Sequence, residues 1–219
     1  MSLQNLGNDL SQALLRPFKG LGRVAEKRSI WEGLALYVII SLLVVFFTAR
    51  AVTLENLTYF LNSLKLPFSE QLAQVFLESL PVFSLILQLI FGPLLFLSWL
   101  AIVNFCAELF SGEGDANSLG AAFGFTSLPA LLIVPAALLS QFFSFKLILI
   151  AAAVSFIWSH ILKIIALKEA HQLTFAHAFM AYLLPVVAFL IALFLFVLMS
   201  VAFLLPLVIQ FLDSITMTF

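Results

Sequence analysis

Five long runs without Asp, Glu, Lys or Arg divide this chain, and they constrain its fold more than any motif does. The runs cover residues 33–49, 79–107, 116–145, 147–162 and 170–212. About 20 apolar residues in a helix cross the hydrocarbon core of a bilayer. In lipid, an α-helix is the only open structure that satisfies its own backbone hydrogen bonds. The sequence therefore predicts an all-α, polytopic membrane helix bundle with about five transmembrane helices.

The bounds of the spans follow from the charges at their ends. The first and fourth runs reach membrane length if Arg50 and Lys163 extend their side chains toward the interface. The last run is either one long helix or a helix followed by a bent segment after Pro206, and we favour one span with a distorted end. The expected spans lie near residues 32–52, 81–104, 119–142, 147–167 and 182–205.

The composition agrees with a membrane protein. Of the 219 residues, 63% are hydrophobic and 10% are charged, and the mean hydropathy is +1.18. A soluble domain of this size needs a larger share of polar surface. The net charge of −1 gives no reason to expect a nucleic-acid partner, and the single cysteine, Cys106, excludes a disulfide within the chain.

The basic residues are distributed unevenly between the two sides of the predicted bundle. An odd number of spans places the two termini on opposite sides. The N-terminal side holds Arg16, Lys19, Arg23, Lys27, Arg28, Lys163 and Lys168. The other side holds only Arg50, Lys65 and Lys146. Because cytoplasmic loops carry an excess of Lys and Arg, we expect the N-terminus in the cytoplasm and the C-terminus outside.

The segment before the first span is amphipathic. Between Leu3 and Val24, apolar residues recur every three or four positions and mostly basic or polar residues lie between them. This pattern predicts an interfacial helix on the cytoplasmic leaflet, kinked or restarted at Pro17. A weaker pattern divided by Pro67 predicts two short interfacial helices in the loop after span one.

The expected domains are an N-terminal amphipathic segment, a transmembrane domain and a short C-terminal tail, at residues 1–31, 32–212 and 213–219.

Glycines and prolines predict irregular helices in spans two and three. The dipeptide Gly92-Pro93 should kink span two, and Pro129 and Pro135 should break the hydrogen-bond ladder of span three twice. Carbonyl groups freed in this way either find partners in packed protein or line a path through the membrane. We favour packing.

Two patterns of small residues predict close contacts between helices. Gly120 and Gly124 form a small-xxx-small pattern at the start of span three, and span four carries Ala151, Ser155 and Ser159 at four-residue spacing. Span four also carries His160 and Lys163 toward its cytoplasmic end. A proton relay needs such groups within the membrane, but we expect His160 to serve helix packing.

The loop before span three offers a possible metal site with a simpler alternative. Glu113, Asp115 and Asn117 alternate like the first ligands of a calcium loop, but Ser118 and Gly124 stand where glycine and glutamate are required. Capping of span three by Asn117 or Ser118 is the stronger interpretation, since acidic residues also suit a helix N-terminus. With no catalytic motif in the sequence, we expect no metal, no cofactor and no enzymatic activity.

Four short motifs occur in an order that is typical of one membrane-protein family. Residues 14–18 place Pro17 before span one, and residues 108–112 end span two with Glu108 and Gly112. Gly124-Phe125 is followed by Pro129, and residues 158–167, beginning at Trp158, are followed by His171, Leu173 and Ala178. Over roughly residues 12–205 the chain resembles the Yip1-domain family, of the prokaryotic type. It departs from the family at Phe125, where tyrosine is usual, and in having Gly-Glu-Gly in place of paired glycines.

The resemblance implies a five-span helical bundle with a cytosolic N-terminus, here in a prokaryotic cytoplasmic membrane. Eukaryotic relatives associate with small GTPases and vesicle traffic. The long cytosolic N-terminal region used there is largely missing here, so we do not expect that role. Some prokaryotic members accompany membrane transporters.

Two functions remain open at this point. The first is a non-enzymatic membrane protein that organises lipid or binds membrane proteins, including its own copies. The N-terminal helix and residues 108–118 and 168–180 would make the contacts. The alternative is a small transporter or channel-like protein with a path along broken spans two and three. The candidate functional or packing residues are Pro17, Gly92, Pro93, Glu108, Gly112, Glu113, Asp115, Gly120, Gly124, Phe125, Pro129, Pro135, Trp158, His160, Lys163 and His171.

Overall fold

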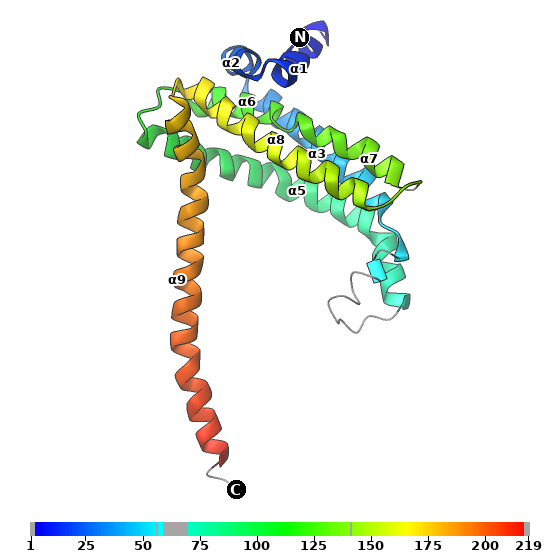
Figure 1. Cartoon of the computed structure of the whole chain (residues 1–219), viewed down its shortest axis with the longest axis vertical. Helices are drawn as coiled ribbons and strands as arrows, with labels where there is room; N and C mark the ends of the chain where they lie inside the picture. Colours follow the sequence, from blue (N-terminus) through cyan, green and yellow to red (C-terminus); the bar gives the residue numbers. More distant parts are fainter. Residues whose placement is uncertain (1–2, 56, 59–69, 141, 217–219) are drawn as a thin grey trace.

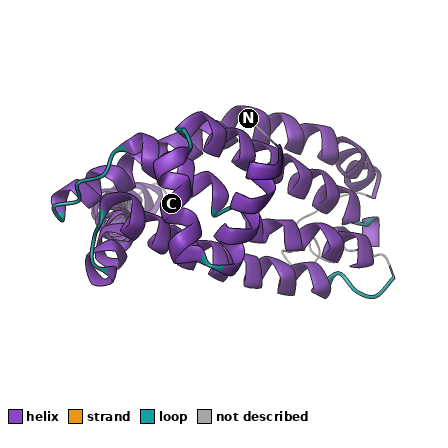
Figure 2. Cartoon of the chain, turned by 90° about the horizontal axis from the view of Figure 1, so that it is seen from above, coloured by secondary structure: helices purple, strands orange, loops and turns teal. Residues whose placement is uncertain are grey.

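The computed structural model describes residues 3–55, 57–58, 70–140 and 142–216, and over these ranges the chain is helical with no strand (Figure 2). The all-α prediction is confirmed. The predicted division of the second amphipathic pattern at Pro67 lies outside the described residues. The elements are α1 (Leu3–Leu15), α2 (Pro17–Lys27), α3 (Ile30–Ala51), α5 (Glu70–Leu109), α6 (Ala116–Phe125), the 3-10 helix η1 (Leu128–Leu132), α7 (Ile133–Ser140), α8 (Lys146–His171) and α9 (Phe175–Thr216).

Five segments in the described chain are long and apolar enough to cross a membrane, as predicted. They are Ile30–Ala51, Gln71–Leu109, Ala116–Ser140, Lys146–His171 and Phe175–Leu204. The last is part of α9, which runs as one helix through Pro206 to Thr216. The single-helix option is therefore the one observed, and the helix continues past residue 213, where the tail was expected to begin.

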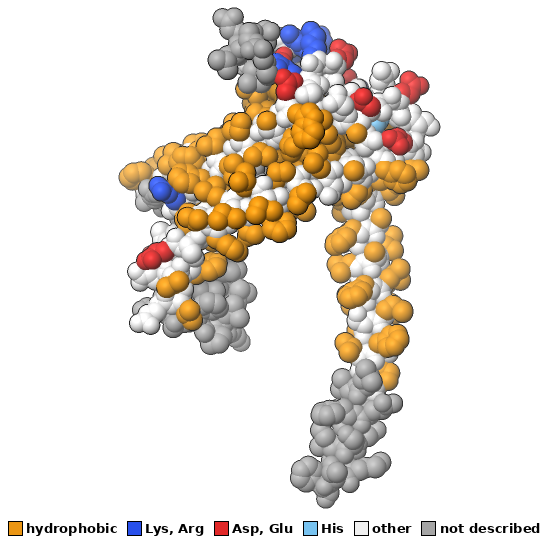
Figure 3. Space-filling model, turned by 180° about the vertical axis from the view of Figure 1, so that it is seen from behind, with side chains coloured by type: hydrophobic (Ala, Val, Ile, Leu, Met, Phe, Trp, Pro, Cys, Tyr) orange, Lys and Arg blue, Asp and Glu red, His pale blue; other side chains and the backbone are white. Residues whose placement is uncertain are grey.

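Four of these segments lie side by side, whereas α9 leaves them at one end (Figure 1). The start of α9 is packed, because Ala178, Ala181 and Tyr182 are buried and the Tyr182 ring meets Trp99 of α5 edge-on at 6.0 Å. Nearly every described side chain from Val186 to Leu204 is exposed. Figure 3 shows apolar side chains on all visible sides of this helix, which suits lipid tails.

The two N-terminal helices lie across one end of the bundle (Figure 1). Pro17 is the first residue of α2, so the amphipathic segment restarts there, as predicted. The apolar stripe of α2 meets protein, because Leu21 and Val24 are fully buried against α6 and α8. The expected apolar contact with the leaflet is thus replaced by packing on the bundle, and exposed Leu15 and Phe18 remain outside it.

The third span is broken once, between α6 and α7. The chain leaves the α-helix after Phe125, turns at Thr126 and Ser127, and passes through η1, where Pro129 occupies the first turn. The predicted second break at Pro135 is wrong. This residue lies in the first turn of α7, where the backbone amide has no intrahelical acceptor, so proline costs no hydrogen bond.

Side-chain hydroxyl groups donate hydrogen bonds to the backbone carbonyls around this break. The side chains of Thr126 and Ser127 donate to carbonyls of the preceding turn, at 2.7 and 2.6 Å. Ser155 of α8 donates to the Pro129 carbonyl at 2.8 Å in a buried contact. Such bonds satisfy polar backbone that would otherwise be costly in lipid. The broken segment is therefore packed against α8, as we favoured.

Glycine lets α3 and α6 approach closely. A Cβ atom on Gly124 would collide with the Gly33 carbonyl, and one on Gly33 would collide with the Gly120 carbonyl. The small-residue pattern of span three therefore packs on the first span. By contrast, Gly92 and Pro93 lie within continuous α5, so they do not end that helix, and the kink expected there stays a prediction.

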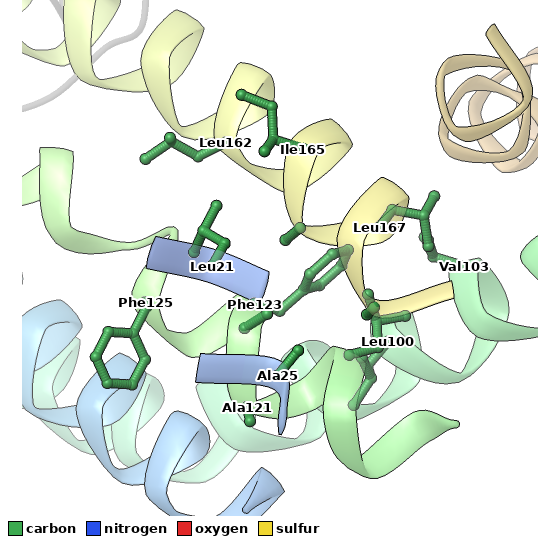
Figure 4. Packing of buried hydrophobic residues seen from close by; sticks show 14 of the residues in the cluster. Leu21, Ala25, Leu100, Val103, Ala121, Phe123, Phe125, Leu162, Ile165 and Leu167 are labelled. Atoms are coloured by element: carbon green, nitrogen blue, oxygen red, sulfur yellow. The ribbon is translucent and has the colours of Figure 1, made fainter. Parts of the chain in front are cut away.

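The largest buried cluster lies where α2, α5, α6 and α8 meet (Figure 4). Figure 4 shows Leu21, Phe123 and Leu167, which enter this cluster from three of these helices. A smaller cluster around Ala51, Ala137 and Ile148 closes the opposite end of the bundle. The first cluster thus joins all four adjacent segments at one end, and the second joins α3, α7 and α8 at the other.

Candidate functional site

Two loops and three helix ends meet beside α2 and form what we call the polar end of the bundle. It comprises α2, the first turn of α3, residues 110–118 and residues 168–174. The Glu113 amide donates to the His171 carbonyl at 3.2 Å, which joins the two loops. A Cβ atom on Gly114 would collide with the Ala170 carbonyl, so glycine is required here for close approach.

His171 is enclosed beneath this loop. Its side chain is 1% exposed, and neither ring nitrogen has a hydrogen-bond partner among the described residues. A Cβ atom on Gly112 would lie 2.8 Å from its Nδ1 atom. Gln172 follows in the left-handed conformation, φ 53°, and ends α8. His171 thus supports the loop and cannot reach a substrate in this conformation.

Asp115 and Asn117 serve two different helix ends. Asp115 is the N-cap of α6, and its carboxylate accepts the Ser118 amide at 2.7 Å. Hydrogen bonding to the Ser118 side chain, and then to its backbone amide, holds the pKa of Asp115 below its usual value. Asn117 instead accepts the Ile30 amide of α3 at 3.0 Å. The predicted cap at Asn117 or Ser118 is therefore wrong, because Asn117 reaches across to a neighbouring helix.

A buried ionic network joins α1 to α3. The Arg28 guanidinium contacts Asp9 at 2.6 Å and Glu32 at 3.2 Å, and the Arg28 and Asp9 side chains are only 8% and 6% exposed. The hydrogen bond to Asp9 raises the pKa of Arg28. Sequence reasoning treated Arg28 only as a topology charge. The signal it missed is the capping box of Ser29 and Glu32 directly before the first apolar run.

An acid-lined depression of about 490 Å³ opens at the polar end, and we call it the acidic hollow. Figure 3 shows acidic side chains gathered at this end of the molecule. The lining contains four carboxylates and no Lys or Arg among the described residues. Glu169 pairs with Lys168 at 2.6 Å just beside it. The lining residues are Gly22, Ala25, Glu26, Glu113, Gly114, Asp115, Ser118, Glu169, Ala170 and Gln172.

A family model described as the Yip1 domain matches residues 11–197, which is most of the chain. The chain belongs to the Yip1 domain family. Its membership and the five apolar helices establish an integral, multi-pass membrane protein. Among curated proteins and among solved structures, no match to this chain was found. The matched part of this Yip1 protein includes the whole polar end.

The structure divides the predicted site residues of the Yip1 domain among several places. One group meets at or beside the polar end, namely Pro17, Glu108, Gly112, Glu113, Asp115 and His171. A second group lies in the broken third span, namely Gly120, Gly124, Phe125, Pro129 and Pro135. Gly92 and Pro93 lie apart in α5, and Trp158, His160 and Lys163 lie deeper along α8. The prediction therefore identified part of one surface together with residues that serve packing.

His160 of the Yip1 protein makes aromatic contacts. Its ring lies 4.1 Å from the Phe156 ring and 5.9 Å from the Tyr182 ring, measured between centroids. The contact with Tyr182 joins α8 to the start of α9. This arrangement suits the packing role that we expected for His160.

Proposed function

We propose that this Yip1 protein is non-enzymatic and binds other membrane proteins through its polar end, which faces the cytoplasm of a prokaryotic cell. The observation that carries the proposal is the acidic hollow. Glu26, Glu113 and Asp115 reach it from α2 and from the loop before α6, and among the described residues none of the three forms an ion pair. The hollow therefore favours a cationic group from a partner.

The expected partner is the basic juxtamembrane segment of another membrane protein. Cytoplasmic segments beside membrane spans carry an excess of Lys and Arg. Hydrogen bonds from such side chains to carboxylates are about twice as strong as those between neutral groups. A depression of about 490 Å³ is large enough to admit one long basic side chain, and its lining residues Asp115 and Glu169 lie at the ends of two of the apolar segments.

The orientation rests on the distribution of charge along the fold. The polar end and the helices that cover it carry Arg16, Lys19, Arg23, Lys27 and Lys168, whereas Arg50 and Lys146 lie at the opposite end. This asymmetry favours a cytoplasmic polar end. The basic residues of α1 and α2 would then lie close to anionic lipid headgroups while the acidic hollow receives protein.

The non-enzymatic assignment is supported by the structural contacts that the polar side chains of the polar end make. The oxygens of Asp115 and Asn117 accept backbone amides at helix ends, and the buried His171 supports a loop. A catalytic acid or base must lie within hydrogen-bond reach of a substrate. These groups instead maintain the shape of the polar end.

The transporter alternative receives less support. A cavity of about 280 Å³ does lie beside spans two and three. However, the helices that line it continue toward the polar end into fully buried residues, including Val103, Leu119 and Leu167. The carbonyls of the broken span are occupied by hydroxyl groups as well. Because the core between this cavity and the polar end is closed, the cavity is better suited to binding a ligand than to conducting a solute across the membrane.

Energy transfer in proteoliposomes tests the proposal. The protein carries a donor dye, and a synthetic transmembrane helix carries an acceptor dye and a Lys-rich cytoplasmic flank. Replacing Glu26 and Glu113 with Gln should weaken association on the order of tenfold, because two unpaired carboxylates are lost. Glu55→Gln, at the opposite end of the bundle, is the matched control. Equal association of a helix with a Gln-rich flank would overturn the proposal.

A further inference from the structure

A second cavity lies among α3, α5, α8 and the broken third span, deeper in the bundle than the acidic hollow. It has a volume of about 280 Å³ and contains one basic side chain, that of Lys163. Tyr37 and Trp99 contribute aromatic walls, and Ser159 lies one helical turn from Lys163 on the same face of α8. The described lining contains no acidic residue.

Lys163 has no counter-charge in the part of the chain that the structure describes. Among the described residues it takes part in none of the ion pairs, and it is only partly exposed. An ammonium group at membrane depth is costly unless it is paired or reaches the interface. The side chain of Lys163 lines the cavity. An unpaired ammonium group in this cavity would be stabilised by a bound anion.

The position of Lys163 along α8 corresponds to the boundary between the hydrocarbon core and the headgroups. The 26 residues of α8 span about 39 Å at 1.5 Å per residue, compared with about 30 Å for the hydrocarbon core. Lys163 is eight residues before the end of α8 at His171, or about 12 Å. Since α2 covers that end of α8, the excess of about 9 Å belongs there. Lys163 then lies roughly 3 Å inside the hydrocarbon boundary.

The cavity is accessible from the lipid side. The start of α9 crosses between α5 and α8, where Tyr182 meets Trp99 and His160, and then leaves them. Beyond that point Leu95, which lines the cavity, is an exposed apolar side chain, and Phe156 is exposed on α8 one turn from His160. An acyl chain can lie along such a surface while a polar headgroup enters between the helices.

We propose that this cavity binds the phosphate group of an anionic phospholipid, with Lys163 as its cation and Ser159 as a hydrogen-bond donor. The volume admits a headgroup and leaves the acyl chains outside, against α5 and α8. Basic pockets between membrane helices on the cytoplasmic side bind headgroups by this chemistry. The site is separate from the acidic hollow and does not depend on the function proposed for it.

Native mass spectrometry of the full-length protein tests the site with phosphatidylglycerol and with phosphatidylcholine of the same chain length. The wild type should bind phosphatidylglycerol about tenfold more tightly. Lys163→Met should remove this preference, whereas Lys163→Arg should keep it. Lys146→Met, at the other end of the same helix, is the matched control. Equal binding of the two lipids to the wild type, or an equal loss in Lys146→Met, would overturn the proposal.

Two further measurements separate the lipid from other occupants. Ser159→Leu fills the cavity while keeping Lys163, and it should also lower binding of phosphatidylglycerol. Inorganic phosphate at millimolar concentration should not displace the bound lipid, and displacement would show a site for the free anion. A photo-crosslinker at position 95, at the exposed edge of the cavity lining, should capture lipid. Capture of α9, from the same chain or from a second copy, would contradict the lipid assignment.

Discussion

Gly33 and Gly124 determine how closely the first and third spans approach. At this position even one methyl group meets backbone that cannot move independently of its helix. Glycine is normally unfavourable within a helix. Its presence in both helices indicates that the gain from close packing exceeds this cost.

Gly124→Ala should therefore destabilise the protein by about 1–3 kcal/mol, because α3 and α6 must separate. Thermal unfolding in mild detergent measures the effect. Gly7→Ala is the matched control, since a Cβ atom there meets nothing within 4 Å. The control should be neutral or stabilising by up to ~1 kcal/mol. A loss of stability in the control as large as that in Gly124→Ala would contradict the packing argument.

Asp115 makes the stability of the polar end depend on pH. The Ser118 hydrogen bond lowers the pKa of the folded-state carboxylate below the unfolded value of about 3.9. The stabilisation is present above the unfolded value and is lost as pH falls through the folded value. Asp115→Asn keeps a capping side chain but has no such dependence.

Melting temperatures of the wild type and Asp115→Asn, measured between pH 7 and pH 3, check this sign. The wild type should be the more stable at pH 7, and the difference should shrink below about pH 4. The effect is small because Asp115 is exposed. A difference that grew as the pH fell would show that the carboxylate is not stabilised in its charged form.

At the scale of elements, α2 is a part of the bundle and not a separate surface helix. Leu21 and Val24 bury its apolar stripe against α6 and α8, and Arg28 fastens its C-terminal end to Asp9 and Glu32. Leu21→Ala should cost about 2–5 kcal/mol, as expected for a buried leucine. Thermal unfolding and limited proteolysis near Arg16 should report the loosened helix.

Leu15→Ala provides the comparison, because Leu15 is 82% exposed at the end of α1. Its change in stability should stay within about 0.5 kcal/mol in detergent. If Leu15→Ala destabilised the protein as much as Leu21→Ala, the apolar stripe would not be packed on the bundle in the way described.

Sequence reasoning reached the elements more readily than their contacts. The five spans were predictable because uncharged apolar runs have few other stable forms in lipid. The N-cap of α6 at Asp115 was not predictable, because Asn117 is an equally suitable capping residue by type. Only the structure shows that Asn117 instead accepts the Ile30 amide. Likewise, the stripe of α2 suits lipid and protein equally well. The cavity at Lys163 is formed by residues from four helices, so no local sequence pattern predicts it.

At the scale of the whole molecule, the fold separates a polar end from an apolar body. The described part of α9 beyond Pro185 is exposed and apolar on nearly every side, so lipid or other membrane proteins must surround it. The acidic hollow lies at the one end where α2, α6 and α8 meet. A partner anchored in the same bilayer can thus contact both surfaces.

A charge exchange measured by energy transfer in proteoliposomes tests the central claim most directly. Changing Glu26 and Glu113 to Lys should abolish association with the helix that carries a Lys-rich flank. Giving that helix a Glu-rich flank should restore association with the changed protein, because the two charge patterns then match again. If the exchanged pair did not associate, or if the original pair associated equally after the change, the acidic hollow would not be the binding surface.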